Sequence, residues 1–387
     1  MITLLAGAEV YAPEALGRRD LLLAAGQILW IGARAPELPA ALLAERIELD
    51  GLRLMPGLID AHAHLTGGGG EAGYGSKVPP MRAGDFLRSG VTSVVGVLGT
   101  DDCTRSTAEL VSAARGFEAA GISAWCHSGG YHVPPVTLTG SLRGDIVHVD
   151  RIIGAGEVAI SDHRSSQPTL DELLRLASEA HVAGLMTGKA GILHLHVGDG
   201  PRGLELVRRA LETCEIPARV FNPTHVNRRK ALFDEALDLA GRGCWIDLTA
   251  FPVAEDEDAW AAEIALARYL ESGHPPERIT ISSDGGGCLP VFDAEGRVAR
   301  YDVGQPSALA TCLKALLDRG WPLERVLPAF TRNVAQLLRL PGKGRLAAGA
   351  DADLLTLDAQ GRVHDVWARG RRWLGAGQAI RQGPYDP

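Results

Sequence analysis

The chain has 387 residues, 46% of them hydrophobic, and a formal net charge of −8 with a sequence pI near 5.9. This acidic balance, with no run of basic residues, argues against a nucleic-acid partner. No apolar stretch approaches the length of a membrane span, and the amino terminus lacks the basic start and long apolar segment of a signal peptide. The six scattered cysteines form no CxxC pair, which favours reduced thiols and a cytoplasmic location.

Both ends of the chain contain short runs of β-forming residues separated by glycines. The first end carries "ITLLAGAEVYA" and "LLLAAGQILWIGA", and the last carries "ADLLTLD" and "VHDVWARGRRWL". Neither end contains a long helical pattern. We therefore predict a small β domain built from residues 1–51 and 342–387 together.

Between residues 52 and 341, short apolar runs alternate with amphipathic helical segments. One such segment begins at Thr169, a typical N-cap, and is expected to end at Gly184. This alternation is typical of α/β proteins with parallel sheets, and eight repeats predict a (β/α)8 TIM-like barrel. An open doubly wound sheet is the alternative, although no dinucleotide fingerprint follows the first run. The eight predicted strands are 52–60, 91–99, 122–130, 157–162, 191–198, 218–225, 244–251 and 278–284.

Histidines and an aspartate gather at the ends of these runs. The first run leads into His62 and His64, which share one strand face because alternate residues point the same way. His196, His225 and Asp284 end the fifth, sixth and eighth runs. In a (β/α)8 barrel the carboxyl ends of the strands hold the active site, and imidazole and carboxylate are standard zinc ligands. The sequence therefore predicts a metal site there.

Several longer motifs resemble the metal-dependent amidohydrolase superfamily, and the resemblance covers nearly the whole chain. "PGLIDAHAH" stands at the entrance to the barrel, and "GKGRLAAGADADLLTLD" stands where the chain returns to the β domain. Within the superfamily the chain is most similar to the β-aspartyl (isoaspartyl) dipeptidases. The motifs that carry this similarity are "HAHLTGGGGEAG", "VTSVVGVLGTD", "GISAWCHSGGYHVPP", "AISDHRSS", "PTHVNR" and "ISSDGGG".

The resemblance implies zinc-dependent hydrolysis of β-aspartyl dipeptides. Zinc lowers the pKa of a bound water, which provides a hydroxide to attack the amide carbonyl. Asp284 would bind metal and also act as general base, later passing the proton to the leaving amine. Tyr131 would donate to the developing oxyanion, although it could instead be a loop aromatic that packs on a neighbour.

The resemblance also implies a set of residues that bind the dipeptide. Glu71, delivered by the "GGGG" loop, would receive the free α-amino group, unless it is a solvated glutamate on a plain loop. Arg164 and Arg228 would bind the two substrate carboxylates, since a guanidinium group can donate two parallel hydrogen bonds to a carboxylate. Either arginine could instead form a structural ion pair at the rim of the barrel. Thr100 and Cys288 complete the predicted set.

Two positions depart from the pattern of the family. The usual bridge between two metals is a carbamylated lysine, and ungapped alignment on "AISDHRS" puts Glu157 there; the nearest lysine, Lys189, lies beyond the next helix. We expect Glu157 to be a ligand that bridges two Zn²⁺ ions. Cys288 stands where the family tends to have a small hydroxyl residue, and a thiol is a weaker hydrogen-bond donor.

Three histidines have no assigned role in this prediction. His132, His163 and His194 are expected to support the ligands or the fold, although His194 shares a face with His196.

Two alternatives to dipeptide hydrolysis remain. The chain could hydrolyse a cyclic amide or an N-acyl amino acid, or it could be a catalytically silent relative that keeps only the fold. The predicted partners are a small dipeptide substrate and further copies of the chain, since similar enzymes are homo-oligomers.

Overall fold

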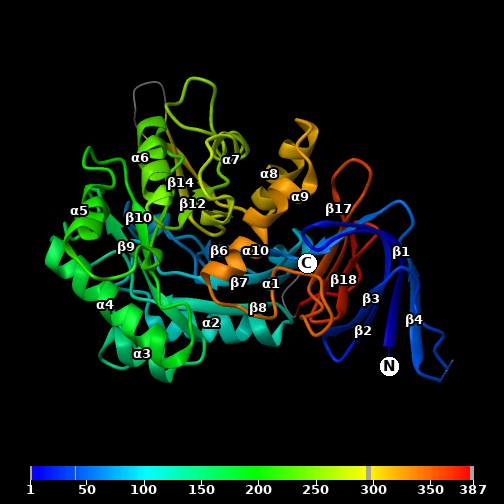
Figure 1. Ribbon diagram of the computed structural model, residues 1–387. Helices are drawn as coiled ribbons and strands as arrows, with labels where there is room; N and C mark the ends of the chain where they lie inside the picture. The colour runs from blue at the N-terminus through cyan, green and yellow to red at the C-terminus, as the bar shows by residue number, and fades with distance from the viewer. Residues whose placement is uncertain (1, 40, 293–297, 384–387) are drawn as a thin grey trace.

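The computed structural model describes residues 2–39, 41–292 and 298–383, and it has a β-sheet part and an α/β part (Figure 1). Strands from both ends of the chain, blue and red in the figure, form the β-sheet part. Of the predicted small β domain, residues 1, 40 and 384–387 lie outside the described residues.

The β-sheet part is one nine-stranded sheet in which the two ends of the chain meet. Its order is β19-β18-β17-β16-β5-β1-β2-β3, and β4 pairs with β1. Leu5, Leu354 and Trp367 are at most 1% exposed in its core. The domain boundaries stay a prediction, and β5 shows that residues just past position 51 also join this sheet. The strands are β1 (Ile2–Tyr11), β2 (Ala15–Ala24), β3 (Gln27–Gly32), β4 (Leu43–Glu48), β5 (Arg53–Pro56), β16 (Leu354–Leu357), β17 (Val363–Ala368), β18 (Arg371–Gly375) and β19 (Gln378–Ala379).

The α/β part contains a parallel strand in each of the eight apolar runs. Six strands form one curled sheet in the order β11-β10-β9-β8-β7-β6, and β12 pairs with β13. β12 packs beside β11, and β13 packs beside β6. The strands are β6 (Leu58–Ala63), β7 (Val91–Gly96), β8 (Ser123–Ser128), β9 (Ile152–Ile160), β10 (Leu193–Val197), β11 (Phe221–Thr224), β12 (Ile246–Thr249) and β13 (Ile279–Ser282).

Helices connect and cover these strands, and their apolar faces share one large core with the strands. Among the described helices, none is both long and apolar enough to cross a membrane. An antiparallel hairpin, β14 (Cys288–Phe292) and β15 (Val298–Val303), follows β13. The α-helices are α1 (Ala83–Arg88), α2 (Thr107–Ala119), α3 (Leu142–His148), α4 (Leu170–Thr187), α5 (Glu205–Thr213), α6 (Lys230–Gly241), α7 (Ala262–Glu271), α8 (Ser307–Asp318), α9 (Leu323–Val326) and α10 (Arg332–Leu337). Single 3-10 turns are η1 (Tyr74–Ser76), η2 (Ala218–Val220), η3 (Pro276–Arg278) and η4 (Leu327–Phe330).

Helix α4 begins where the sequence predicts but ends later. Thr169 forms a capping box with Glu172, and this satisfies main-chain groups at the helix start. The predicted end at Gly184 is wrong, because the helix runs to Thr187 and Gly188 closes it in the left-handed conformation (φ 74°). Gly184 instead lets the helix approach a neighbouring segment, since a Cβ there would lie 2.6 Å from Cα of Gly191.

Two strand boundaries also differ from the prediction. The first run is divided between β5 and β6, so one stretch serves both sheets. The fourth strand begins at Ile152 rather than at Glu157. Glu157 therefore lies inside β9 with fully buried neighbours on both sides, and not at the start of the strand. The run "IIGAG" hid this strand, because glycine is depleted in strands.

Candidate metal centre

The six predicted metal ligands lie at or near the carboxyl ends of five strands. All five parallel strands point the same way, so these side chains meet at one end of the α/β part. Each is at least nine-tenths buried except Asp284, whose side chain is 15% exposed. The six are His62 on β6, His64 just after it, Glu157 on β9, His196 on β10, His225 after β11 and Asp284 after β13.

Glu157 lies between two pairs of imidazoles, one pair at each carboxylate oxygen. Its Oε1 is 3.6 Å from Nε2 of His62 and 3.5 Å from Nε2 of His64. Its Oε2 is 3.1 Å from Nδ1 of His196 and 3.7 Å from Nε2 of His225. One fully buried carboxylate thus faces histidines from three other strands.

Asp284 faces the first of these pairs. Its Oδ1 is 3.1 Å from Nε2 of His64 and 3.6 Å from Nε2 of His62. Two sets of three donor atoms lie within 4.8 Å of one another: His62, His64 and Asp284 form one, and His62, Glu157 and His225 form the other. His62 belongs to both sets, so they make one continuous cluster.

His196 lies at the edge of this cluster and outside both sets. Its Nδ1 contacts Glu157, and its Nε2 is 3.0 Å from Oδ2 of Asp162. The hydroxyl of Tyr131 is 2.8 Å from the same Nδ1. His196 therefore connects the cluster to the residues that line its mouth.

The donor atoms of the cluster fit a divalent metal ion. Within the described residues, His62 Nε2, Glu157 Oε1 and Asp284 Oδ1 are buried without a well-formed hydrogen bond. Buried polar atoms are normally hydrogen-bonded, so atoms without a bond that converge on one point favour an ion. Imidazole nitrogen and carboxylate oxygen suit zinc and similar ions.

The charges of the cluster depend on its carboxylates. Burial alone would lower the pKa of His62, but Glu157 and Asp284 outweigh burial and raise this pKa to about 9. Burial would raise the pKa of Glu157, yet His62 and the hydrogen bond from His196 hold it well below its usual range. At neutral pH and without metal, the ring of His62 is therefore the positively charged imidazolium with a proton on each nitrogen. Metal binding must release one of these two protons.

The glycine loop that follows β6 brings Glu71 to the mouth of the cluster. Gly67 (φ 80°) and Gly69 (φ 71°) adopt left-handed conformations, and a Cβ on either would lie within 2.3 Å of a main-chain oxygen. Only glycine permits such a close approach. The loop ends at Glu71, whose Oε1 is 3.2 Å from Nη1 of Arg164.

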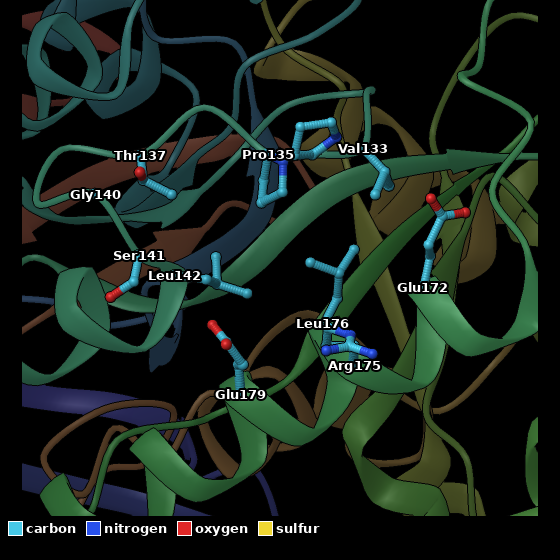
Figure 2. Close-up of a pocket in the computed structure, with 11 residues that line it drawn as sticks. Val133, Pro135, Thr137, Gly140, Ser141, Leu142, Glu172, Arg175, Leu176 and Glu179 are labelled. Atoms are coloured by element: carbon cyan, nitrogen blue, oxygen red, sulfur yellow. The ribbon is translucent and has the colours of Figure 1, made fainter.

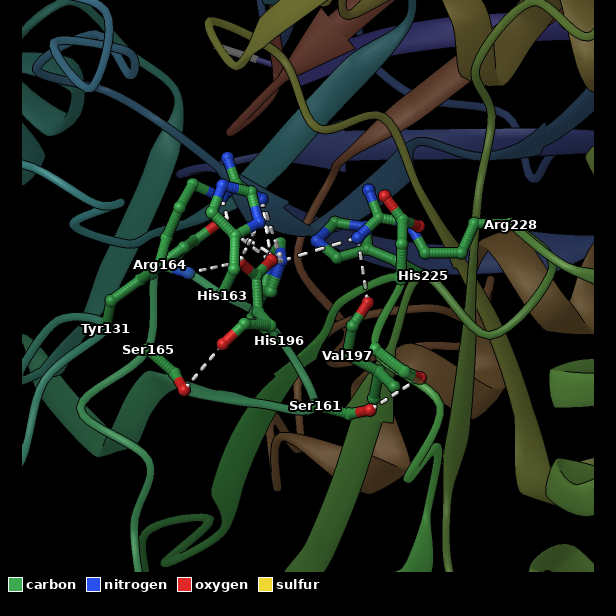
Figure 3. Close-up of polar contacts among 12 residues, drawn as sticks. Tyr131, Ser161, His163, Arg164, Ser165, His196, Val197, His225 and Arg228 are labelled. Carbon is green, nitrogen blue, oxygen red and sulfur yellow. Dashed lines mark hydrogen bonds and ion pairs between the residues drawn. The ribbon is translucent and has the colours of Figure 1, made fainter.

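Arg164 and Arg228 lie on two sides of His196 (Figure 3). Arg164 contacts Asp162 through Nε at 3.0 Å and through Nη2 at 2.8 Å, and its guanidinium lies 5.5 Å from the centre of the Tyr131 ring. Arg228 donates from Nη1 to the main-chain oxygen of Val197 at 2.9 Å. Arg164 thus pairs with two acids, whereas Arg228 bonds to the backbone and forms one longer ion pair, with 3.5 Å between its Nε and Oδ1 of Asp199.

The remaining predicted residues lie around this mouth. Cys288 begins β14 beside the glycine loop, and burial together with the charge of Glu71 raises its pKa to about 11, so the thiol is neutral. Thr100 is partly buried and follows Gly99, where an added Cβ would lie 2.9 Å from Cε1 of His64.

The three histidines set aside in the sequence have distinct positions. His163 is 92% exposed, and His132 Nδ1 lies 2.8 Å from an oxygen of Asp102. His194 Nε2 lies 2.8 Å from Nδ1 of His62, behind the cluster.

Sequence reasoning missed Asp162 and Asp60 as parts of the site. Asp162 ties Arg164 to His196, and its place two residues before Arg164 at one strand end was the available signal. Asp60 accepts from the main-chain N–H of Ser283 at 3.0 Å, and so it joins β6 to the end of β13. Burial raises the pKa of Asp60 to about 6, and the hydrogen bonds from Ser283 act against this rise.

A surface cavity of about 390 Å³ lies away from the cluster, between the loop that follows β8 and helix α4 (Figure 2). Pro135 and Leu176 form part of its apolar wall, and Glu172 and Glu179 line its α4 side. None of the predicted site residues lines it. The candidate chemistry therefore belongs to the buried cluster.

Comparison with known proteins identifies the family of the chain. The sequence profile of the Amidohydrolase family matches residues 53–372. The crystal structure of a beta-aspartyl dipeptidase from Fervidobacterium islandicum AW-1, in complex with beta-Asp-Leu dipeptide, is 40% identical, covers 99% of each chain and has a TM-score of 0.92. A deacetylase of Agrobacterium fabrum is 26% identical over 360 residues, which is 88% of this chain and 78% of that protein. An allantoinase of Deinococcus radiodurans is 26% identical over 443 residues, covering 95% and 94% of the two chains.

The chain belongs to the amidohydrolase family, and it is a hydrolase. The family is metal-dependent, and the histidine–carboxylate cluster supplies a candidate metal site in this chain. Its structural similarity to beta-aspartyl dipeptidases extends over nearly the whole chain.

Proposed function

We propose that the protein hydrolyses β-aspartyl dipeptides at the metal cluster. The observation that carries this proposal is the ion pair between Glu71 and Arg164 at the mouth of the cluster, with 3.2 Å between Oε1 and Nη1. A β-aspartyl dipeptide presents a free α-ammonium and a free α-carboxylate on one carbon atom. Glu71 complements the ammonium, and Arg164 complements the carboxylate. Arg228, on the other side of His196, is then available for the second substrate carboxylate.

The spacing of these charges distinguishes β-linked from α-linked peptides. In an α-aspartyl peptide the α-carboxyl group is part of the amide, and the free side-chain carboxylate lies further from the ammonium. Because Glu71 and Arg164 are in direct contact, we expect them to bind the compact head group better. Two opposite charges held in contact discriminate by leaving a mismatched group of the substrate unpaired.

We propose two zinc ions, bridged by Glu157. The support is the position of this carboxylate, which has His62 and His64 at Oε1 and His196 and His225 at Oε2. A glutamate keeps the negative charge of the carbamate that the family usually has here. Asp284 would be a further ligand beside His64.

The chain supplies the acid–base groups of the proposed reaction. Zinc, when bound, polarises the amide carbonyl and lowers the pKa of a water. Burial would raise the pKa of Asp284, but His62 and His64 hold it well below its usual range, so this carboxylate is ionised and can accept a proton. Asp284 then returns the proton to the leaving amine. Burial raises the pKa of Tyr131, which keeps its hydroxyl protonated as a donor to the oxyanion.

The test uses zinc-loaded protein with β-Asp-Leu and with its N-acetyl derivative. We expect release of aspartate and leucine from β-Asp-Leu, and at least tenfold lower kcat/KM for the acetylated peptide. Acetylation removes the ammonium that Glu71 is proposed to bind. Equal rates on both peptides would refute the role of Glu71 and Arg164.

A second candidate is hydrolysis of another amide, such as an N-acyl amino acid or a cyclic amide. Two positions that depart from the pattern of the family, Glu157 and Cys288, favour this activity. The sequence similarity to a deacetylase and an allantoinase also favours it. Preferred cleavage of the acetylated substrate at its acetyl group, or of a cyclic ureide, would support this activity instead.

We also infer that the two parallel sheets close into one (β/α)8 barrel. The support is that β12 lies beside β11 and β13 beside β6, with a bridge between Ala63 and Gly285. A homo-oligomeric state stays a prediction, which light scattering of the purified protein would test.

A further inference from the structure

A chain of hydrogen bonds runs behind the metal cluster and ends at His62. Nδ2 of Asn222 donates to the main-chain oxygen of Trp245 at 3.2 Å. Oδ1 of Asn222 lies 2.7 Å from Nδ1 of His194, and Nε2 of His194 lies 2.8 Å from Nδ1 of His62. The three side chains are at most 1% exposed, so water does not compete for these bonds.

The chemistry of the groups fixes the direction of each bond. Because the amide nitrogen of Asn222 donates to a carbonyl, its oxygen must face His194 and can only accept. His194 therefore donates from Nδ1, and the Nε2 of its neutral ring accepts. His62 must then donate from Nδ1, which leaves its Nε2 as the nitrogen that faces Glu157 and Asp284.

We propose that His194 and Asn222 are positioning residues that hold His62 as an Nε2 ligand of the metal. The ring of His62 could otherwise rotate or take the other tautomer, and both changes would remove the lone pair from the cluster. Metal-bound histidines commonly depend on such a partner at the second ring nitrogen. This inference rests on the proposed metal-binding role of His62.

The packing around His194 supports the same conclusion. A Cβ on Gly156 would lie 2.5 Å from the main-chain oxygen of His194 and 2.9 Å from its Cβ. His194 is thus held tightly against the residue that precedes Glu157. One side chain thereby ties the positions of two proposed ligands, on β6 and β9, to each other.

The experiment compares His194→Met with His194→Gln. Methionine fills the space but is a poor acceptor, whereas the amide oxygen of glutamine can reach the position of Nε2 and accept from His62. His127→Met is the matched control, because the His127 ring also packs on His194, with centroids 5.4 Å apart, while neither of its ring nitrogens has a hydrogen-bond partner among the described residues. Zinc affinity of the metal-free proteins is measured by chelator competition, and their melting temperatures are recorded without metal.

We expect His194→Met to weaken zinc binding about 10- to 100-fold, the usual effect of removing a partner of a ligand. His194→Gln should recover most of the affinity, and His127→Met should bind zinc as the wild type does. Asn222→Leu provides a second arm and should weaken binding in the same direction, even if His194→Met does not fold.

The outcomes separate this inference from the proposed function. If the wild type binds zinc and neither His194→Met nor Asn222→Leu weakens binding, the positioning role is wrong. Equal losses in His194→Met and His194→Gln would also overturn it, because they would show a packing effect. If the wild type binds no zinc, the proposed metal chemistry itself fails.

Discussion

Gly99 lies against the ring of His64, one of the proposed metal ligands. A Cβ added to Gly99 would lie 2.9 Å from Cε1 of His64. Packed carbon atoms lie at about 3.5–4.0 Å, so the ring would have to move by about 0.6–1.1 Å. Metal–ligand distances tolerate only about 0.2 Å. Gly99→Ala should therefore disturb the metal site far more than its small change in volume suggests.

The expected size follows from the cost of overpacking, about 1–3 kcal/mol. In the metal-free protein the His64 ring can shift to relieve the contact, whereas a bound metal holds it in place. The strain should therefore appear as about 5- to 150-fold weaker metal binding, since about 1.4 kcal/mol corresponds to a factor of ten.

The assay is zinc affinity of Gly99→Ala measured by chelator competition. Gly116→Ala on α2 is the matched control, because a Cβ there would meet open space. In a helix this change should raise the free energy of unfolding by about 0.5–1 kcal/mol and leave zinc affinity unchanged. Wild-type zinc affinity in Gly99→Ala would refute the placement of His64 as a ligand.

Three further predictions concern the bridge, the oxyanion donor and acid stability. Glu157→Gln removes the charge but not the volume, and we expect zinc content to fall from two ions per chain to one or none; two retained ions would rule out the bridge. Tyr131→Phe should lower kcat about 10²- to 10³-fold with little change in KM, as for other oxyanion donors, and an unchanged kcat would exclude this role. Burial lowers the pKa of His127 to about 3, so below pH 6.5 the unfolded chain binds a proton that the native state does not. The free energy of unfolding should then fall by at most about 1.4 kcal/mol per pH unit between pH 6.5 and about 3, and His127→Met should flatten this slope in acid denaturation.

The sequence was sufficient to predict which strand ends carry the cluster. Apolar runs end in His62, His196 and His225, and parallel strands bring their carboxyl ends together whatever their separation along the chain. Thr169 likewise predicted the start of α4, because a capping box is a local interaction. Features set by local pattern and strand polarity were therefore accessible from residues alone.

Features that depend on tertiary contact were not accessible. By strand periodicity, His194 and His196 share one face of β10. However, His196 contacts Glu157, whereas His194 bonds to Nδ1 of His62. Gly184 has the character of a helix end in the sequence, but its function is close packing on Gly191. These outcomes depend on neighbours from distant strands, which a periodic pattern does not identify.

The most direct test of the proposed function is kcat/KM of the zinc-loaded protein for β-Asp-Leu and for α-Asp-Leu. The two peptides have the same atoms and charges and differ only in which carboxyl group forms the amide. We expect cleavage of the β-linked peptide with at least a hundredfold preference, because Glu71 and Arg164 are in contact and match the compact head group. Equal cleavage of both peptides, or cleavage of neither by protein that contains zinc, would contradict it.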